Sequence, residues 1–330
     1  MSAARTLPLT LSIPLALLAE TPARAAGPGP LVDREEAKSA VLDAPAPPTL
    51  PALAHRDLTF TFEYTAAVIQ TKKDDRSGDA FAYFAHTDCE YPIVPRSWFV
   101  GLANDVASAA VPGVGTGFVL GNPEISGRGV WSSVRGLSSG GGLGVVLPVP
   151  RSLSPAEEEV LRTVRTVRPW DLASFSSLTL TFRPWIDIRH VTGGLIFQLR
   201  QAVDWSINLK GSGDGETTSG AKPRLSDFTA RLTFYMGYRL NEAIGVGMEL
   251  WEVYEVTKDL PNDDDRATFA LSPSIRFMLP RVQPALSFLF PLATPLRGDV
   301  ASYYAARFNI GFNFDLRPGK KDVASALQIE

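Results

Sequence analysis

Apolar and polar residues alternate along most of the segment from Leu178 to Arg189. Leucine, phenylalanine and isoleucine recur at every second position, with threonine, arginine and aspartate between them. Successive side chains of a β-strand point to opposite faces, so this period of two predicts a strand with one apolar and one polar face. The same period is found in seven further segments: 58–68, 195–206, 228–239, 244–254, 268–277, 282–292 and 304–315.

The connections between these segments alternate in length. Tight links are predicted at His190 to Thr192, Leu240 to Glu242 and Pro280 to Arg281, and longer polar links at 211–226, 258–265 and 294–300. Membrane barrels of the up-and-down type have short periplasmic turns and longer outer loops, whereas a soluble Greek-key sandwich has no reason to sort its loops in this way. The pattern therefore predicts an antiparallel transmembrane β-barrel of the all-β class.

The N-terminal half shows the period less clearly. Residues 72–79 form a predicted outer loop, followed by strands at 80–85 and 98–102, one within 115–137 and one at 143–149. Together these give about twelve strands, an even number as in single-chain bacterial barrels. Ten strands also fit, because the glycine-rich stretch 113–142 specifies its register weakly.

The first 25 residues have the features of an export signal. Arg5 supplies the positive end, Leu7 to Leu18 the apolar stretch, and Ala23 to Ala25 a small-residue cleavage site. The stretch is too short for a permanent transmembrane helix, although a retained anchor is the alternative. We expect a Pro/Ala-rich periplasmic extension at 26–56, a barrel at 57–316, a C-terminal tail at 317–330, and residence in the outer membrane.

One helix is expected inside a long outer loop after Val149. Ser154, Pro155 and Glu157 match an N-cap, a first-turn proline and a capping-box glutamate, and four apolar residues follow at helical spacing. The sequence leaves open whether this helix enters the mouth of the barrel, folds over it or lies on the outer surface.

The polar face of the strands carries eleven charged residues that we expect to line the lumen. They are Glu63, Arg183, Asp187, Arg189, Arg200, Asp204, Arg231, Arg239, Glu249, Arg276 and Arg307. Two roles compete for this set: selection of solutes in a polar pore, or mutual neutralisation in structural ion pairs. The excess of arginines favours anionic or polar solutes.

Six aromatic residues are candidates for girdles at the two edges of the bilayer, although core packing would explain each of them individually. They are Trp185, Trp205, Tyr238, Trp251, Tyr254 and Tyr304.

Composition and motifs argue against several other classes of protein. A net charge of −3 does not suit a nucleic-acid binder, and the single cysteine, Cys89, excludes an internal disulfide. No Gly-x-Ser-x-Gly elbow occurs, and His86 with Asp88 and Cys89 lacks a partner pair at the spacing of a metal site. The acidic run 263–265 could hold Ca²⁺ loosely in an outer loop, but a solvated charge run is the favoured interpretation. We therefore expect no enzyme activity, no cofactor and no resident metal.

The chain resembles the outer-membrane β-barrel proteins of diderm bacteria and, more loosely, the porin-like transporters associated with aromatic-compound degradation. The resemblance rests on the signal, the strands from Asp57 to Leu316, and the glycine-rich segments 121–124 and 140–146. It implies insertion by the outer-membrane assembly machinery, which recognises a C-terminal aromatic strand. Phe312 and Phe314 supply the aromatics, but the tail continues beyond them.

The function expected from the sequence is passive passage or binding of small solutes, with outer-membrane lipid and the assembly machinery as partners. A non-conducting structural or adhesion barrel is the alternative. A barrel-embedded lipid-modifying enzyme that depends on His86 is less favoured.

Overall fold

The fold is taken from a computed structural model, which describes residues 58–71, 79–132, 136–209, 225–257, 266–279, 281–293, 295–296 and 300–314. The predicted signal at 1–25, the extension at 26–56 and the tail at 317–330 lie outside these residues. In this part of the chain, no helix is both long and apolar enough to cross a membrane.

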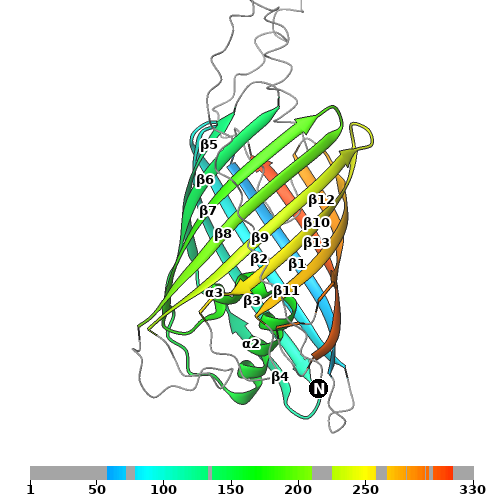
Figure 1. Cartoon of the computed structure of the whole chain (residues 1–330). Coiled ribbons are helices and arrows are strands. Elements are labelled where there is room, and N and C mark those ends of the chain that lie inside the picture. The colour runs from blue at the N-terminus through cyan, green and yellow to red at the C-terminus, as the bar shows by residue number, and fades with distance from the viewer. Residues whose placement is uncertain are drawn as a thin grey trace, which may run out of the picture.

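The strands form a closed antiparallel ring (Figure 1). Their bounds are β1 Leu58–Thr71, β2 Ala80–Val94, β3 Trp98–Val111, β4 Gly115–Leu120, β5 Glu124–Ser132, β6 Leu137–Val146, β7 Thr179–Thr192, β8 Leu195–Asn208, β9 Ser226–Arg239, β10 Ile244–Glu255, β11 Ala267–Phe277, β12 Val282–Pro291 and β13 Val300–Phe314. Apart from β4 and β5, which both pair with β3, each strand pairs with its neighbours in sequence, and β13 returns to pair with β1. The predicted up-and-down barrel is confirmed.

The ring has twelve strand positions because β4 and β5 share one of them. Both pair with β3, β4 along Val106–Val111 and β5 along Trp98–Ala103. They are two pieces of one interrupted strand, with the break at residues 121–123. The expected count of about twelve is therefore confirmed.

The outer face of the barrel is apolar. On β7, Ile186 and Ile188 are 57% and 48% exposed, whereas Asp187 and Arg189, which alternate with them, are almost completely buried. A water-soluble fold would bury the isoleucines and expose the charges. Phe234 and Phe288 also lie exposed on the outer face, so these phenylalanines do not belong to a soluble core.

Several predicted boundaries are wrong. Strands β2 and β3 run to Val94 and Val111, well beyond the predicted ends, and β6 spans Leu137–Val146 rather than 143–149. The predicted tight link at His190–Thr192 belongs to β7, and the chain turns at Gly193, whose φ of 58° suits glycine. These differences arise because strands continue through polar and glycine-rich residues while their neighbours still offer hydrogen-bond partners.

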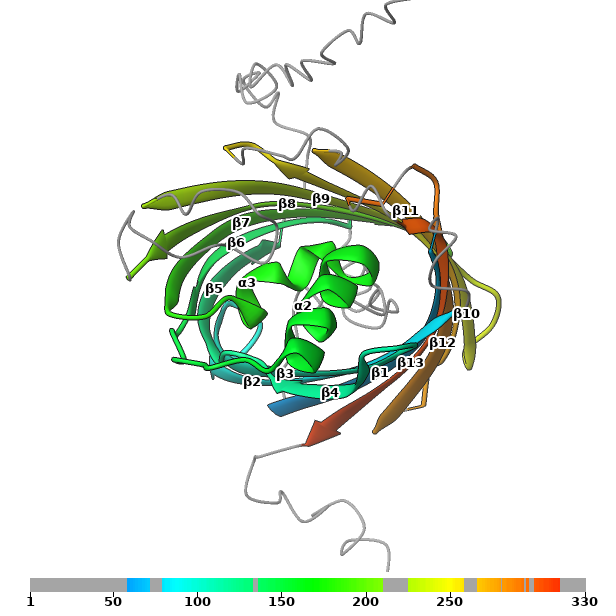
Figure 2. The ribbon, with the colours of Figure 1, turned by 90° about the horizontal axis from the view of Figure 1, so that it is seen from below.

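The expected helix is present and lies inside the barrel. Figure 2 shows α2 (Pro155–Val167) and α3 (Leu172–Phe175) within the ring of strands, joined by the short 3-10 helix η2 (Pro169–Asp171). Ser154 caps α2: its hydroxyl accepts from the Glu157 amide, and its own amide donates to the Glu157 side chain. We call residues 155–175 the helical insert. Of the three placements left open, the structure selects entry into the barrel.

The insert fills one end of the barrel with a dry core. We call this the helical end; there β6 ends at Val146 and β7 begins at Thr179. Val160, Val164 and Val167 of α2 are fully buried. They pack on inward residues of the strands, chiefly alanines, including Ala67, Ala82, Ala107, Ala109 and Ala305. Small side chains on the wall leave room for a helix, so this end of the lumen is closed by apolar packing.

The insert also fills the break between β4 and β5. The Asn122 side chain donates to the carbonyls of Ala173 and Ser176, and the backbone amide of Asn122 donates to the Ser174 carbonyl. Arg151 donates to the Asn122 side chain at 2.6 Å and to the Phe175 carbonyl at 3.1 Å. The broken strand therefore hydrogen-bonds to the end of α3, which ties the insert to the wall.

Candidate functional site

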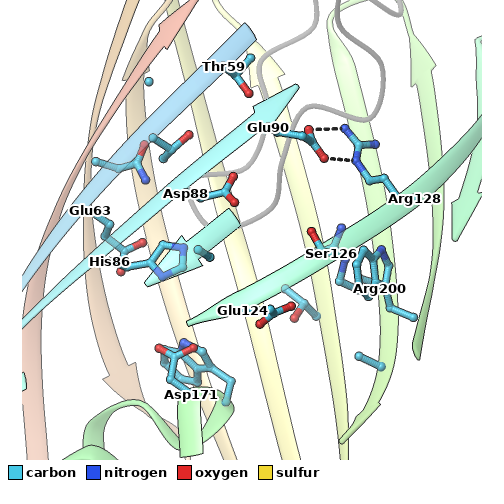
Figure 3. A pocket seen from close by; sticks show the side chains of 18 of the residues that line it. Thr59, Glu63, His86, Asp88, Glu90, Glu124, Ser126, Arg128, Asp171 and Arg200 are labelled. Carbon is cyan, nitrogen blue, oxygen red and sulfur yellow. Dashed lines mark hydrogen bonds and ion pairs between the residues drawn. The ribbon is translucent and has the colours of Figure 1, made fainter. Parts of the chain in front are cut away.

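Next to the insert, the lumen holds a polar cavity of about 240 Å³. Its walls come from strands all around the ring, and Trp170 and Asp171 of η2 face it from the insert. Glu63, His86, Asp88, Glu90 and Glu124 line it, and Figure 3 shows Arg128 bonded to Glu90. Further arginines line it from β7, β8, β9 and β11: Arg183, Arg200, Arg231 and Arg276.

The eleven predicted lumen residues fall into three groups. The first lines the cavity: Glu63, Arg183, Arg200, Arg231 and Arg276. The second is buried inside the barrel without lining it: Asp187, Arg189, Asp204, Glu249 and Arg307. Arg239 forms the third group alone; it lies near the Leu240–Ala243 turn, where it donates to the Asn241 carbonyl at 3.3 Å.

Ion pairs join most of these residues across neighbouring strands. Arg183 binds Asp204 through two nitrogens at 2.9 and 3.1 Å and also contacts Glu124. Arg200 binds Asp187 through two bonds of 2.7 Å. Such bidentate pairs hold the guanidinium in a fixed plane. Much of the predicted lining is thus neutralised by the protein itself.

A separate buried pair lies in the wall beyond the cavity. Arg307 on β13 donates to Glu249 on β10 at 2.7 Å and to the hydroxyls of Ser272 and Ser287. Both ionic side chains are about 1% exposed or less. Because an isolated charge is costly at this depth, removing either partner would leave the other uncompensated.

The helical insert is anchored to the barrel by charge as well as by packing. Arg168, just after α2, donates to Glu63 at 2.6 Å and to Asp171 at 2.5 Å. Arg165 binds Glu255 on β10 at 3.0 Å. Burial works to lower the pKa of the Arg168 guanidinium, but Asp171 and Glu63 outweigh it and raise that pKa above its usual value. Arg168 is therefore a permanent cation at the junction of insert and wall.

Aromatic stacking adds to this anchoring. The rings of Trp170 in η2 and Trp251 in β10 stack with centroids 4.4 Å apart, and Arg231 donates to the Trp170 carbonyl at 2.8 Å. Trp251 is buried and Trp185 lines the cavity, so the prediction that these two belong to an interfacial girdle is wrong. The other four candidates are exposed on the outer face: Trp205, Tyr238, Tyr254 and Tyr304.

Several lumen residues were missed because the predicted strands ended too early. His86, Asp88 and Glu90 continue the inward positions of Phe84 on β2, so extending the period of two past Ala85 would have found them. Arg128 was hidden among glycines that carry no periodic signal; it binds Glu90 at 2.7 Å and lies over the Phe99 ring. Nothing in the local sequence indicated that Arg168 would reach Glu63.

The geometry lends little support to lipid chemistry at His86. Its ring nitrogen pairs with Asp105 at 2.8 Å, and its side chain lines the cavity rather than the lipid-facing surface. Cys89 follows at an odd offset, so it points to the other face of β2. The described residues contain no group of three or more histidine, cysteine or acidic side chains that could hold a metal ion.

No protein family model and no curated protein matches this sequence. Among solved structures, the fold is similar to an outer membrane channel from Pseudomonas putida F1, with a TM-score of 0.58, 10% identity, and coverage of 81% of this chain and 100% of that one. The KdgM porin (TM-score 0.42, 10% identity, 77% and 99% coverage) and the CymD monoaromatic hydrocarbon channel (0.40, 9%, 79% and 89%) match less well. The expected resemblance to outer-membrane β-barrels is thereby confirmed at the level of the fold.

Proposed function

We propose that this protein is a passive outer-membrane channel for small polar solutes, in which the helical insert restricts the lumen. The observation that carries the proposal is a charged cavity of about 240 Å³ enclosed by a barrel whose outer face is apolar. By this measure of volume, roughly 15 Å³ is enough to hold one water molecule. The cavity therefore suits a small organic solute and is far too small for a folded domain.

Outer-membrane residence follows from the same arrangement. A closed ring satisfies every strand edge, which is the condition for strands to cross lipid. The exposed leucines, phenylalanines and tyrosines of the outer face would contact acyl chains and headgroups. We propose export by the signal at 1–25, insertion by the outer-membrane assembly machinery, and outer-membrane lipid as the surrounding partner.

The insert supports a gated rather than a wide-open channel. It is packed on the wall at the helical end and anchored by Arg165 and Arg168. Solutes that cross the barrel would have to pass beside the insert or displace it. Loosening the insert should therefore increase permeability.

Conductance in planar bilayers tests the proposal. The wild-type protein should give discrete current steps, and Arg231→Gln, which alters the cavity wall and its bond to Trp170, should change both step size and anion preference. Arg200→Gln should change selectivity in the same direction. Arg266→Gln, an exposed arginine outside the cavity, is the matched control and should leave both unchanged. Absence of steps above the bare bilayer would refute the channel.

The apolar packing of the insert favours one alternative, a non-conducting structural barrel. A plug with a dry interface can be a permanent part of the fold rather than a gate. If neither the wild type nor a variant with a destabilised insert conducts, the structural role is supported.

A further inference from the structure

Almost all ionisable groups that line the cavity are paired inside the protein. The acids Glu63, Glu90, Glu124 and Asp171 bind Arg168, Arg128, Arg183 and Arg168 respectively. Arg200, Arg231 and His86 bind Asp187, Asp204 and Asp105. Each of these charges has its counter-ion within reach, so none of them requires one from a solute.

Two cavity charges differ from the rest. Within the described part of the chain, Asp88 on β2 has no ion-pair or hydrogen-bond partner, and its carboxylate points into the cavity (Figure 3). Arg276 on β11 has no carboxylate partner there either; its only bond is a long one of 3.4 Å to Gln283. Its Nε has no hydrogen-bond partner, although the side chain is only 7% exposed. A buried donor without a partner is unusual and costs free energy unless a ligand satisfies it.

The strand register places these two charges four strands apart in the ring, on β2 and β11. Asp88 pairs with Thr61, Thr61 with Gly311, and Gly311 with Gln283, the residue that Arg276 contacts. Three strand spacings separate Asp88 from Gln283, and Arg276 lies one strand further, so Asp88 and Arg276 are about 19 Å apart across the strands. Both side chains reach inward from their strands, so the space between their charged groups is shorter than this.

The wall between the two charges is lowest at Gly311. On the row of Asp88 it consists of Thr61, Gly311 and Gln283, and Gly311 contributes no side chain to the lumen. A Cβ at Gly311 would come no closer than 4.0 Å to Gln283, so the space above this glycine is free of nearby wall atoms. A chain-like solute could cross this part of the wall with one end at each charge.

We propose that the cavity binds a short linear zwitterion, with its ammonium end at Asp88 and its carboxylate end at Arg276. This assignment rests on the proposed channel function and names the solute class for it. One unpaired anion and one unpaired cation that line the same cavity complement a solute that carries both charges at its two ends. An extended dipeptide, about 7 Å long, and ω-amino acids of similar length belong to this class.

Binding to the purified full-length protein in detergent at neutral pH tests the assignment. The probes are 6-aminohexanoate, hexanoate and hexylammonium, which share a carbon chain and differ in charge. Isothermal titration calorimetry should give an affinity for 6-aminohexanoate at least tenfold above that for either single-charge analogue, because each charge-assisted hydrogen bond adds about that factor. Equal affinities for the three probes would overturn the proposal.

Single substitutions assign each end. Asp88→Asn should weaken 6-aminohexanoate and hexylammonium about tenfold and leave hexanoate unchanged, whereas Arg276→Gln should weaken 6-aminohexanoate and hexanoate and leave hexylammonium unchanged. Neither substitution breaks an ion pair, so the barrel should fold. Glu158→Gln and Arg162→Gln are the matched controls. Each removes one negative or one positive charge from an exposed residue outside the cavity, and neither should change the affinity for any of the three probes. Equal effects of either cavity variant on all three probes would contradict the assignment.

A third variant does not alter charge. Gly311→Leu should fill the space between the two ends and weaken 6-aminohexanoate at least tenfold while heat-modified gel mobility stays that of a folded barrel. Unchanged binding in this variant would overturn the location. Bilayer conductance separates the two proposals: a conducting protein without zwitterion preference refutes only the solute class, and a silent protein that binds 6-aminohexanoate refutes only the channel.

Discussion

The two parts of the lumen differ although the same strands build both. At the helical end, inward positions of β1 and β2 carry Ala67, Ile69 and Ala82, which pack against the insert. A few residues along the same strands, inward positions carry Glu63, Asp88 and Glu90, which face the cavity. The inward face of a barrel strand is therefore not always polar. Its side chains are apolar where they pack against the insert and polar where they face the cavity.

This difference predicts that different substitutions destabilise the two parts. At the helical end, added volume or charge should lower the free energy of unfolding. In the charged region, removing one partner of an ion pair should lower it. Four substitutions test this contrast, from the largest expected effect to the smallest.

A charge in the dry core should have the largest effect. Val164 is fully buried between α2 and the wall, so Val164→Asp should lower the free energy of unfolding by about 5 kcal/mol, because an uncompensated carboxylate replaces apolar contacts. Urea unfolding followed by tryptophan fluorescence measures the loss, and proteolysis should cut the released insert. Arg162→Asp on the exposed side of α2 should stay within about 0.5 kcal/mol of the wild type. Equal loss in both variants would mean that α2 is not packed on the wall.

Removal of the cation that anchors the insert comes next. Arg168→Gln leaves Glu63 and Asp171 buried without their partner and should cost about 4 kcal/mol. The double variant Arg168→Gln with Glu63→Gln removes one of the stranded carboxylates and should recover part of the loss. A loss in the double variant equal to the sum of the two single-variant losses would show that the pair is not coupled.

Substitutions at two glycines compare how tightly the helical end and the cavity are packed. A Cβ at Gly117 would lie 2.5 Å from the Ala156 carbonyl oxygen of α2, whereas one at Gly311 meets nothing closer than 4.0 Å. Gly117→Ala should therefore cost about 2 kcal/mol, because the helix backbone must move. Gly311→Ala should be nearly neutral in the same urea titration. The reverse order of stabilities would contradict the contrast between a packed end and an open cavity.

The smallest effect concerns the start of α2. Hydrogen bonds from the Ser154 backbone amide and hydroxyl hold the pKa of Glu157 below its ordinary value of 4.5. A lowered carboxyl pKa means that this stabilisation is complete above pH 4.5 and is lost as the pH falls through the folded-state value. Protease protection of the insert should weaken over this acid range in the wild type and less so in Glu157→Gln. Identical pH profiles would show that the capping box does not contribute.

The outer face could be predicted from the sequence because lipid imposes one rule on it. Most outward positions within the bilayer are apolar, so Ile186, Ile188 and their counterparts on other strands repeat every second residue, although Gln201 is also exposed on this face. This period was enough to predict the number of strands in the C-terminal half. It was less clear for residues 80–149, because strands β2 to β6 contain alanines, glycines and polar residues that do not alternate with large apolar ones.

The ion pairs and contacts between lumen residues could not be predicted in the same way. Arg183 and Arg200 were expected to face inward, but their pairing with Asp204 and Asp187 depends on register between β7 and β8. The contact of Arg168 with Glu63 joins positions 105 residues apart, and no local pattern records it. The same holds for the two aromatic residues, Trp185 and Trp251, that were assigned to the interface but lie inside.

The sequence by itself determined a closed ring of about twelve amphipathic strands and a capped helix between two of them, because period, turn residues and capping residues are local properties of the chain. Only the tertiary structure decided that the helix enters the barrel, that most lumen charges neutralise one another, and that Asp88 and Arg276 are left facing a cavity. These outcomes depend on distances between residues far apart in the chain. Such distances are set by strand register and barrel closure.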